Sequence, residues 1–323
     1  MSYVGPDFDP PQPRRSALRR PLTVAVAAVV VGAVAGWGVW QAVGDSGGGS
    51  GANQAAGQTP RSATNAPATS AGSPSGEPTA SEDGKKASPS ASSSSPATDG
   101  PLKGKVVVVD PGHNPGNFQH TTEINRKVNI GTGTKECDTT GTTTNDGYME
   151  AEFTLDVSRR LRALLEQQGA TVKFTQDEDR PWGPCIDERA RIGNEAEADA
   201  VVSIHADGSG TGSRGFHVIL PGSVNEGTAD TRPIVGPSRA LGERIAGKFV
   251  RATGTAPSNY VGDGTGLVTR QDLGGLNLST VPKVFIECGN MRDSNDAALL
   301  TSGAWRQKAA QGISEGIVSF LRG

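Results

Sequence analysis

The stretch KVVVVDPGH, residues 105–113, decides the fold class of this chain. Its four consecutive valines are typical of a buried strand, and the Pro-Gly pair after them indicates a tight turn. His113 is therefore expected directly after the first strand of a folded domain.

Strand and helix patterns alternate after this first strand. Further strands are predicted at residues 171–176, 200–207, 215–221 and 283–288, and helices at residues 150–168, 187–198, 238–253 and 304–321. The first of these helices is amphipathic, with one apolar face formed by Phe153, Val157, Leu161, Leu164 and Leu165. Such alternation indicates a three-layer α/β fold, a single domain without a second folded module.

The N-terminal part of the chain carries an uncharged apolar run at residues 22–43. About 20 apolar residues suffice to cross a bilayer. Arginines precede the run, so residues 1–21 are expected in the cytoplasm and the rest outside. A cleaved signal peptide is the alternative, although the run is long for one. The domain then lies outside the cytoplasm either way, as a single-pass cell-membrane protein or as a secreted or periplasmic one.

Residues 44–101 form a Ser, Ala, Gly and Pro-rich linker. Few large apolar side chains are present to offset the entropy of ordering, so a flexible tether is expected. The folded part is then residues 102–323. The net charge is −3, with 31 basic and 34 acidic residues.

Binding of a nucleic acid usually needs an excess of positive charge on the protein, so no nucleic-acid partner is expected. A monomer is expected, because a monomer needs no surface for binding a second copy.

Three of the predicted strands end on residues capable of metal binding or acid–base chemistry: His113, His205 and Glu287. Ligand sites in α/β sheets gather at the carboxyl ends of strands. Glu287 follows an apolar strand, where burying a carboxylate is costly without compensation. Each residue alone also fits a structural role, as a hydrogen-bonded loop histidine or a salt-bridged glutamate.

Two histidines and one carboxylate make a common catalytic zinc set. Glu150 and Glu152 both open the helix at residues 150–168 and could supply the carboxylate. Glu150 lies three and seven residues before Phe153 and Val157, so it continues the inward-facing stripe, whereas Glu152 falls on the flank. The predicted ligands of one zinc ion (Zn2+) are therefore His113, Glu150 and His205.

DPGH, a glutamate opening a helix, SIHAD and ECG follow one another in this order. The ordered set resembles the zinc-dependent N-acetylmuramoyl-L-alanine amidases, and GYMEAEF resembles their actinobacterial members. The resemblance implies a twisted mixed sheet flanked by helices and a peptidoglycan substrate. It also implies zinc binding by His113, Glu150 and His205, and a catalytic role for Glu287. In that role, Glu287 would take a proton from water and return it to the leaving amine of L-alanine.

One departure from the family pattern lies in ECGNMRD, where many members have E-x-G-F-x-S-N. Asn290 replaces the aromatic residue, which changes the local substrate contacts and keeps the carboxylate. Two alternative functions stay open at this point. One is a catalytically inactive peptidoglycan-binding or regulatory protein, and the other is a zinc peptidase that cuts within the stem peptide.

The chain has three cysteines, and an extracytoplasmic domain permits a disulfide. Cys137 and Cys185 both lie in loop sequence, so we expect them to pair. Cys288 is expected to be a buried packing residue at a strand end. His217 alternates with its apolar neighbours and is expected to be structural.

The connection at residues 114–149 is unusually long, at 36 residues rich in Gly, Thr and Asn. A structureless connection of this length is uncommon inside a domain and usually has a function. We expect a hairpin around IGTG, residues 130–133, beside the site. It could cover the zinc or bind glycan, and the sequence does not distinguish these two roles.

Overall fold

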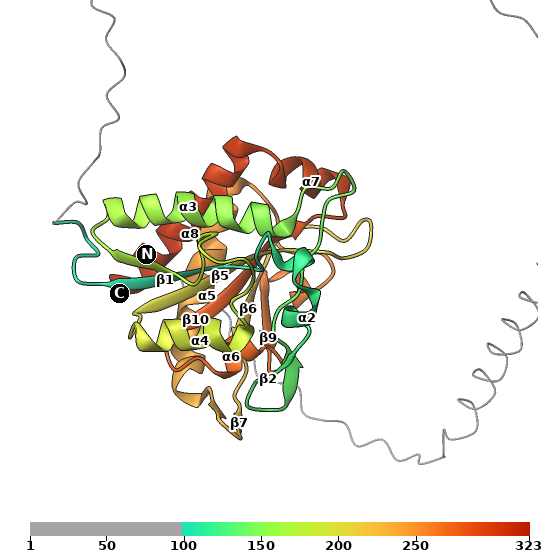
Figure 1. The fold of residues 1–323 in the computed structure, drawn as a ribbon. Helices are drawn as coiled ribbons and strands as arrows, with labels where there is room; N and C mark the ends of the chain where they lie inside the picture. The colour runs from blue at the N-terminus through green and yellow to red at the C-terminus, as the bar shows by residue number, and fades with distance from the viewer. Residues whose placement is uncertain (1–98) are drawn as a thin grey trace, which may run out of the picture. The chain divides into compact units, whose positions relative to one another are not determined.

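The structure is a computed structural model that describes residues 99–323 (Figure 1). The predicted cytoplasmic tail at 1–21, the apolar run at 22–43 and nearly all of the linker at 44–101 lie outside the described residues. Within residues 99–323, none of the helices combines the length and the apolar composition that a membrane crossing requires.

A six-stranded sheet forms the centre of the domain. Its first four strands run parallel, the fifth is antiparallel to the fourth, and the sixth is parallel to the fifth. The sheet is therefore mixed, as the family resemblance implied. In spatial order the strands are β4 (Thr171–Phe174), β1 (Val106–Pro111), β5 (Ala200–Asp207), β10 (Lys283–Asn290), β6 (His217–Pro221) and β9 (Leu267–Arg270).

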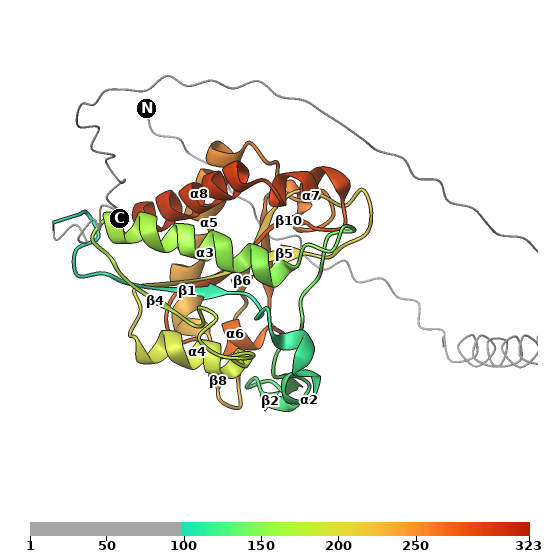
Figure 2. The same ribbon diagram turned by 45° about the horizontal axis from the view of Figure 1, so that its top comes forward.

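Helices cover both faces of this sheet, which confirms the predicted three layers (Figure 2). One face carries the long helices α3 (Glu150–Gln167), α5 (Arg232–Thr253) and α8 (Gly303–Leu321). The other face carries α4 (Ile186–Glu195) and the short α6 (Gly274–Asn277).

The main hydrophobic core lies between the sheet and the three long helices. Phe153, Val157, Leu161 and Leu165 of α3 are fully buried there, as the apolar stripe predicted. Full burial of each such side chain contributes about 1.5–3 kcal/mol. This stripe fixes the rotation of α3, and with it the direction in which its first residue, Glu150, points.

Shorter elements surround the sheet. A hairpin of β2 (Lys127–Asn129) and β3 (Thr134–Glu136) is connected by residues 130–133, so the hairpin predicted around IGTG is confirmed. The other short elements are η1 (Asn117–Gln119), α2 (Thr121–Ile124), β7 (Asn225–Glu226), β8 (Ala229–Asp230), η2 (Gly262–Gly264) and α7 (Ser294–Leu300).

The structure departs from the predicted boundaries at α5 and β9. Helix α5 begins at Arg232 rather than at residue 238, because Pro233 lies in its first turn, where a missing N–H group costs little. The helix continues through Pro237, and Ile234 before it is buried. Strand β9 had no sequence signal, since it is a four-residue edge strand without a fully buried side chain.

The buried carboxylate of Asp110, on β1, is hydrogen-bonded to β5, β10, α4 and the residue that follows β4. Its Oδ1 accepts hydrogen bonds from Thr175 Oγ1 at 2.6 Å and Arg189 Nη1 at 2.8 Å. Its Oδ2 accepts from Ser203 Oγ at 2.8 Å and Lys283 Nζ at 3.2 Å. Burial alone would raise the pKa of Asp110, but the two cations hold that pKa far below its usual range. The carboxylate therefore stays ionised although only 1% of it is exposed.

Arg189 extends this cluster to the backbone of the DPGH turn. Its guanidinium donates to the carbonyl oxygens of Pro111 at 2.6 Å and His113 at 2.8 Å. It also donates to Asp138 Oδ2 at 3.0 Å. Against the effect of burial, Arg189 and His113 lower the pKa of Asp138 to about 2. One buried guanidinium thus holds the turn that presents His113.

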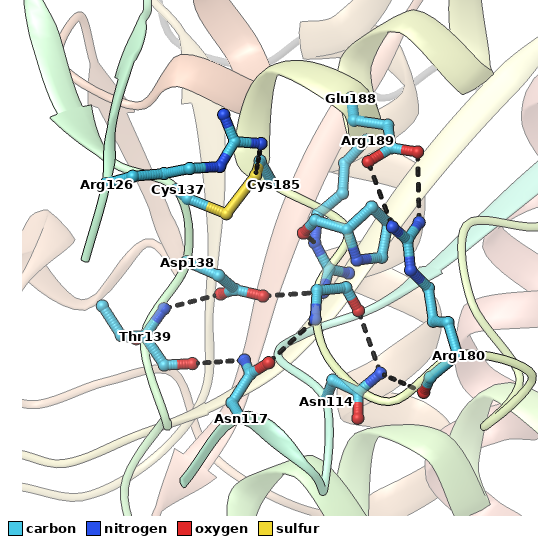
Figure 3. The surroundings of a disulfide bond; sticks show 12 residues. Asn114, Asn117, Arg126, Cys137, Asp138, Thr139, Arg180, Cys185, Glu188 and Arg189 are labelled. Atoms are coloured by element: carbon cyan, nitrogen blue, oxygen red, sulfur yellow. Dashed lines mark hydrogen bonds and ion pairs between the residues drawn. A yellow bond between two sulfur atoms is a disulfide. The ribbon is translucent and has the colours of Figure 1, made fainter. Parts of the chain in front are cut away.

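The predicted disulfide between Cys137 and Cys185 is present. Figure 3 shows how it links the segment after β3 to the residue before α4, with Arg126 Nη2 donating to Cys185 Sγ at 3.0 Å. Both half-cystines are buried. Cys288 is free and buried in the main core, as predicted.

Removal of the disulfide should destabilise the fold. The bond joins residues 48 positions apart, and closing a loop of this size is worth about 4 kcal/mol in the chain-entropy model. We expect the double substitution Cys137→Ser and Cys185→Ser to lower the free energy of unfolding by about this amount in a denaturant titration without reductant. Reductant should reproduce the loss in the native chain and leave the variant unchanged. Equal unfolding midpoints for the native chain and the variant would contradict the prediction.

The low pKa values of Asp110 and Asp138 make stability depend on pH. In the unfolded chain both carboxyls titrate near a pKa of about 3.9, so the unfolded state binds protons first as the pH falls. The two carboxylates should therefore contribute their full stabilisation above about pH 5. The free energy of unfolding should decrease as the pH falls from there to about pH 2. Denaturant titrations across this range should show a shallower decrease for Asp138→Asn than for the native chain. An identical pH dependence in the variant would count against a contribution from Asp138.

Candidate metal centre

His113 follows β1 through a tight turn and has a left-handed backbone, with φ of 62°. Gly112 before it packs so closely on His205 that any Cβ would overlap the imidazole. His113 Nδ1 lies 3.0 Å from the carbonyl oxygen of Thr139, which fixes the proton of a neutral ring on Nδ1. The Nε2 lone pair of His113 then faces Glu150.

Glu150 is the first residue of α3 and only 4% exposed. Its Oε1 lies 3.2 Å from His113 Nε2 and 2.9 Å from His205 Nδ1. Its Oε2 accepts a hydrogen bond from the backbone N–H of Thr142 at 2.9 Å. Burial opposes ionisation, but the two histidines lower the pKa of Glu150 below its usual range. Glu150 in turn raises the pKa of His113 well above its usual range, again against the effect of burial.

The neighbouring carboxylate, Glu152, lies outside this cluster. Its side chain is exposed, and Oε2 accepts from the backbone N–H of Met149 at 3.4 Å at the start of the helix. The structure thus brings Glu150, and not Glu152, to the two histidines. The inward stripe of α3 is the physical reason.

His205 lies on β5 and completes the cluster. Its ring is perpendicular to that of His113, with centroids 5.0 Å apart, and stacks on Phe285 at 5.3 Å. One donor atom from each of His113, Glu150 and His205 lies within 4.8 Å of the others. Two imidazole nitrogens and one carboxylate oxygen in this arrangement could hold a divalent metal ion.

Glu287 lies beside this cluster on β10, where it pairs in register with His205 of β5. Its Oε2 is buried and has no hydrogen-bond partner among residues 99–323. Burial, with Glu150 and Asp207 nearby, raises the pKa of Glu287 well above its usual range. Glu150 and Glu287 thus have pKa values shifted in opposite directions, which is typical of two carboxyls with different chemical roles.

A groove of about 280 Å³ opens over these side chains. The acidic groups Glu150, Asp207 and Glu287 share it with one arginine. It is lined by His113, Thr139, Gly141, Glu150, His205, Ala206, Asp207, Gly208, Ile219, Arg270, Leu273, Phe285 and Glu287.

His205 and Glu287 lie within their strands rather than at the last residue. Strand β5 ends at Asp207, as predicted, and β10 continues to Asn290, two residues past its predicted end. Both side chains project from the sheet face opposite the main core, because their neighbours Ile204 and Ile286 are buried in that core. The site therefore lies on a sheet face, close to the ends of the parallel strands.

The residues that support His113, which are Asp110, Asp138 and Arg189, were not predicted from the sequence. Asp110 follows four valines, and the cost of burying a carboxylate there was a usable signal, as it was for Glu287. Arg189 falls in the buried stripe of α4 with Ala190 and Gly193, which is an unusual place for a guanidinium. Asp138 had no comparable signal, because it lies in an irregular loop beside a cysteine.

Comparison with known proteins agrees with these motifs. A family model described as N-acetylmuramoyl-L-alanine amidase, Amidase_3, matches residues 107–319. The N-acetylmuramoyl-L-alanine amidase Rv3717 of Mycobacterium tuberculosis is 41% identical over 231 residues, which cover 71% of this chain and 91% of the relative.

Two solved structures are similar over the same region. The amidase Ami1 of Mycobacterium smegmatis matches with a TM-score of 0.63 and 40% identity, over 68% of this chain and 98% of that one. The apo form of Ami1 from Mycobacterium abscessus matches with a TM-score of 0.62 and 42% identity, over 68% of this chain and 100% of that one. The chain therefore belongs to the N-acetylmuramoyl-L-alanine amidase family, Amidase_3.

Proposed function

We propose that this amidase hydrolyses the amide bond between N-acetylmuramic acid and L-alanine in peptidoglycan, with one zinc ion held by His113, Glu150 and His205. Glu287 is the proposed proton acceptor. The observation that carries the proposal is the convergence of one donor atom from each of the three residues within 4.8 Å, beside a buried and unpartnered Glu287 oxygen.

The donor set suits zinc. Two imidazoles and one carboxylate are a common protein contribution to catalytic zinc sites, which keep a further position open. Glu150 supplies negative charge, and its effect on the pKa of His113 indicates that positive charge is stabilised here. When bound, zinc would act as a Lewis acid that polarises the amide carbonyl and lowers the pKa of the water bound to it.

The chain's own residues then divide the remaining work. The Glu287 carboxylate accepts a proton from the attacking water and returns it to the leaving nitrogen of L-alanine. The raised pKa of Glu287 makes its carboxylate a stronger base than an exposed one. His113 is kept in one orientation by the Thr139 carbonyl and by Arg189, which binds the His113 carbonyl oxygen.

Two other functions predict different products. A zinc peptidase would use similar residues and release shortened stem peptides, and an inactive wall-binding protein would release nothing. A binder has no use for a buried carboxyl such as Glu287, whose unpartnered oxygen costs free energy. Mass spectrometry of digested peptidoglycan separates the three, since amidase activity releases stem peptides that begin with L-alanine.

We further propose that the domain acts outside the cytoplasm, as a monomer, on the peptidoglycan of the cell wall. The apolar run at residues 22–43 supports a membrane anchor or an export signal, and residues 44–101 support a tether. The disulfide between Cys137 and Cys185 is consistent with an oxidising location.

Glu287→Gln should reduce turnover while leaving the bound zinc in place. The substitution keeps size and removes proton transfer, which is worth about 10²- to 10⁴-fold in rate. We expect stem-peptide release from purified peptidoglycan to fall by this factor, with an unchanged zinc content per chain. Release at the native rate would exclude Glu287 as the proton acceptor.

Glu150→Ala and Glu152→Ala form a matched pair at the start of α3. The first removes a proposed ligand and should lose both bound zinc and activity, because two histidines alone leave the set incomplete. The second removes an exposed side chain two residues away and should leave the zinc content unchanged. Zinc measured by mass spectrometry after dialysis checks both. The reverse pattern would transfer the ligand role to Glu152.

A further inference from the structure

His217 of β6 lies directly beside Glu287. The two residues are paired in register across the antiparallel strands β6 and β10. Residues opposite one another in such a pair project from the same face, with Cβ atoms about 4.5–5.5 Å apart. Glu287 is therefore flanked by His205 of β5 on one side and by His217 on the other.

Both side chains carry a buried polar atom without a partner. His217 is 5% exposed, and its Nδ1 makes no hydrogen bond within the part of the chain that the structure describes. Glu287 Oε2 makes none either. Buried polar atoms are nearly always paired in folded proteins, because an unpaired one keeps the full cost of desolvation. Two such atoms on side chains that project from the same face of the sheet could satisfy one another.

The other polar groups around His217 already have partners. The Tyr260 hydroxyl donates to Asp207 Oδ2 at 2.7 Å, and its ring meets the His217 ring edge-on at 6.0 Å. The Arg270 guanidinium is bound to Asp272 at 2.8 and 2.6 Å.

The protonation state of His217 suits a donor to a carboxylate. Burial lowers the pKa of His217, and Arg270 adds to this effect while Asp207 opposes it. A neutral imidazole offers one N–H donor and one lone pair. Among these neighbours in the described part of the chain, the Glu287 carboxyl has an oxygen, Oε2, that accepts no hydrogen bond, and His217 has a nitrogen, Nδ1, that makes none.

We propose that His217 is a positioning residue for Glu287, donating a hydrogen bond from its imidazole to one carboxyl oxygen so that the other oxygen faces the metal centre. The inference rests on the proposed role of Glu287 as proton acceptor. The structure contains no hydrogen bond between these two side chains. Forming the bond requires the carboxyl group to turn about its terminal torsion, which has a broad and shallow energy profile. Hydrogen bonds of catalytic groups commonly tighten only when the substrate is bound.

The test compares His217→Leu with His217→Gln in the full-length chain. Leucine removes the donor, whereas glutamine keeps an N–H group at a similar distance from the backbone. On soluble N-acetylmuramoyl-L-alanyl-D-isoglutamine, His217→Leu should lower kcat by about 10- to 100-fold, the usual effect of losing such a supporting contact. KM and zinc content should stay close to native, and His217→Gln should recover most of kcat. His217→Phe repeats the test if the leucine variant does not fold.

Two controls separate positioning from a structural role. In a Glu287→Gln background, adding His217→Leu should lower the residual rate no further, because the two residues act as one unit. Leu220→Val disturbs the same strand on its opposite, core-facing side and should leave kcat near native.

Three outcomes would overturn the inference. Native kcat in His217→Leu would do so directly. His217 would be structural if kcat fell equally in the leucine and glutamine variants, in proportion to the decrease in their melting temperatures. It would also be structural if the losses of His217→Leu and Glu287→Gln were independent in the double variant. Native turnover in Glu287→Gln would remove the proposed role of Glu287 itself, and this result is distinguishable because it does not involve His217.

Discussion

The buried ion pair between Asp110 and Arg189 connects the sheet to the metal centre. Asp110 accepts hydrogen bonds from β5, from β10, from Thr175 after β4 and from Arg189 of α4. Arg189 also binds the backbone of the turn that presents His113. Loss of one partner from such a pair leaves an uncompensated buried charge, which typically costs about 3–5 kcal/mol. The same contact therefore stabilises the fold and holds one of the three candidate metal ligands in place.

The electrostatics of the site separate two carboxyls that lie close together. The Glu150 carboxylate contacts two histidines and accepts hydrogen bonds from two backbone N–H groups. Its negative charge is therefore stabilised and available to a cation. Glu287 receives no such donor at Oε2 and lies in a buried position, so its affinity for a proton is raised. Two residues of the same type thus acquire different chemical roles from their surroundings alone.

The disulfide and the segment that follows the β2–β3 hairpin also hold residues at the edge of the groove in place. Cys137 is followed by Asp138 and Thr139, which contact Arg189 and His113. The covalent link to Cys185 holds these residues against the start of α4. The long connection before Glu150 therefore contributes to the position of His113, because the backbone carbonyl of Thr139 in this connection fixes the imidazole.

Local sequence patterns determined the elements of this fold and most of the candidate site. Side-chain direction repeats every two residues in a strand and every 3.6 in a helix, so the pattern showed which faces are buried and chose Glu150 over Glu152. Only the tertiary structure decided the neighbours. Arg189 binds Asp110 from 79 positions away, and His217 lies opposite Glu287 in the pairing of β6 with β10. Periodicity fixes the face from which a side chain projects, whereas its partner depends on strand order and register, which no local pattern encodes.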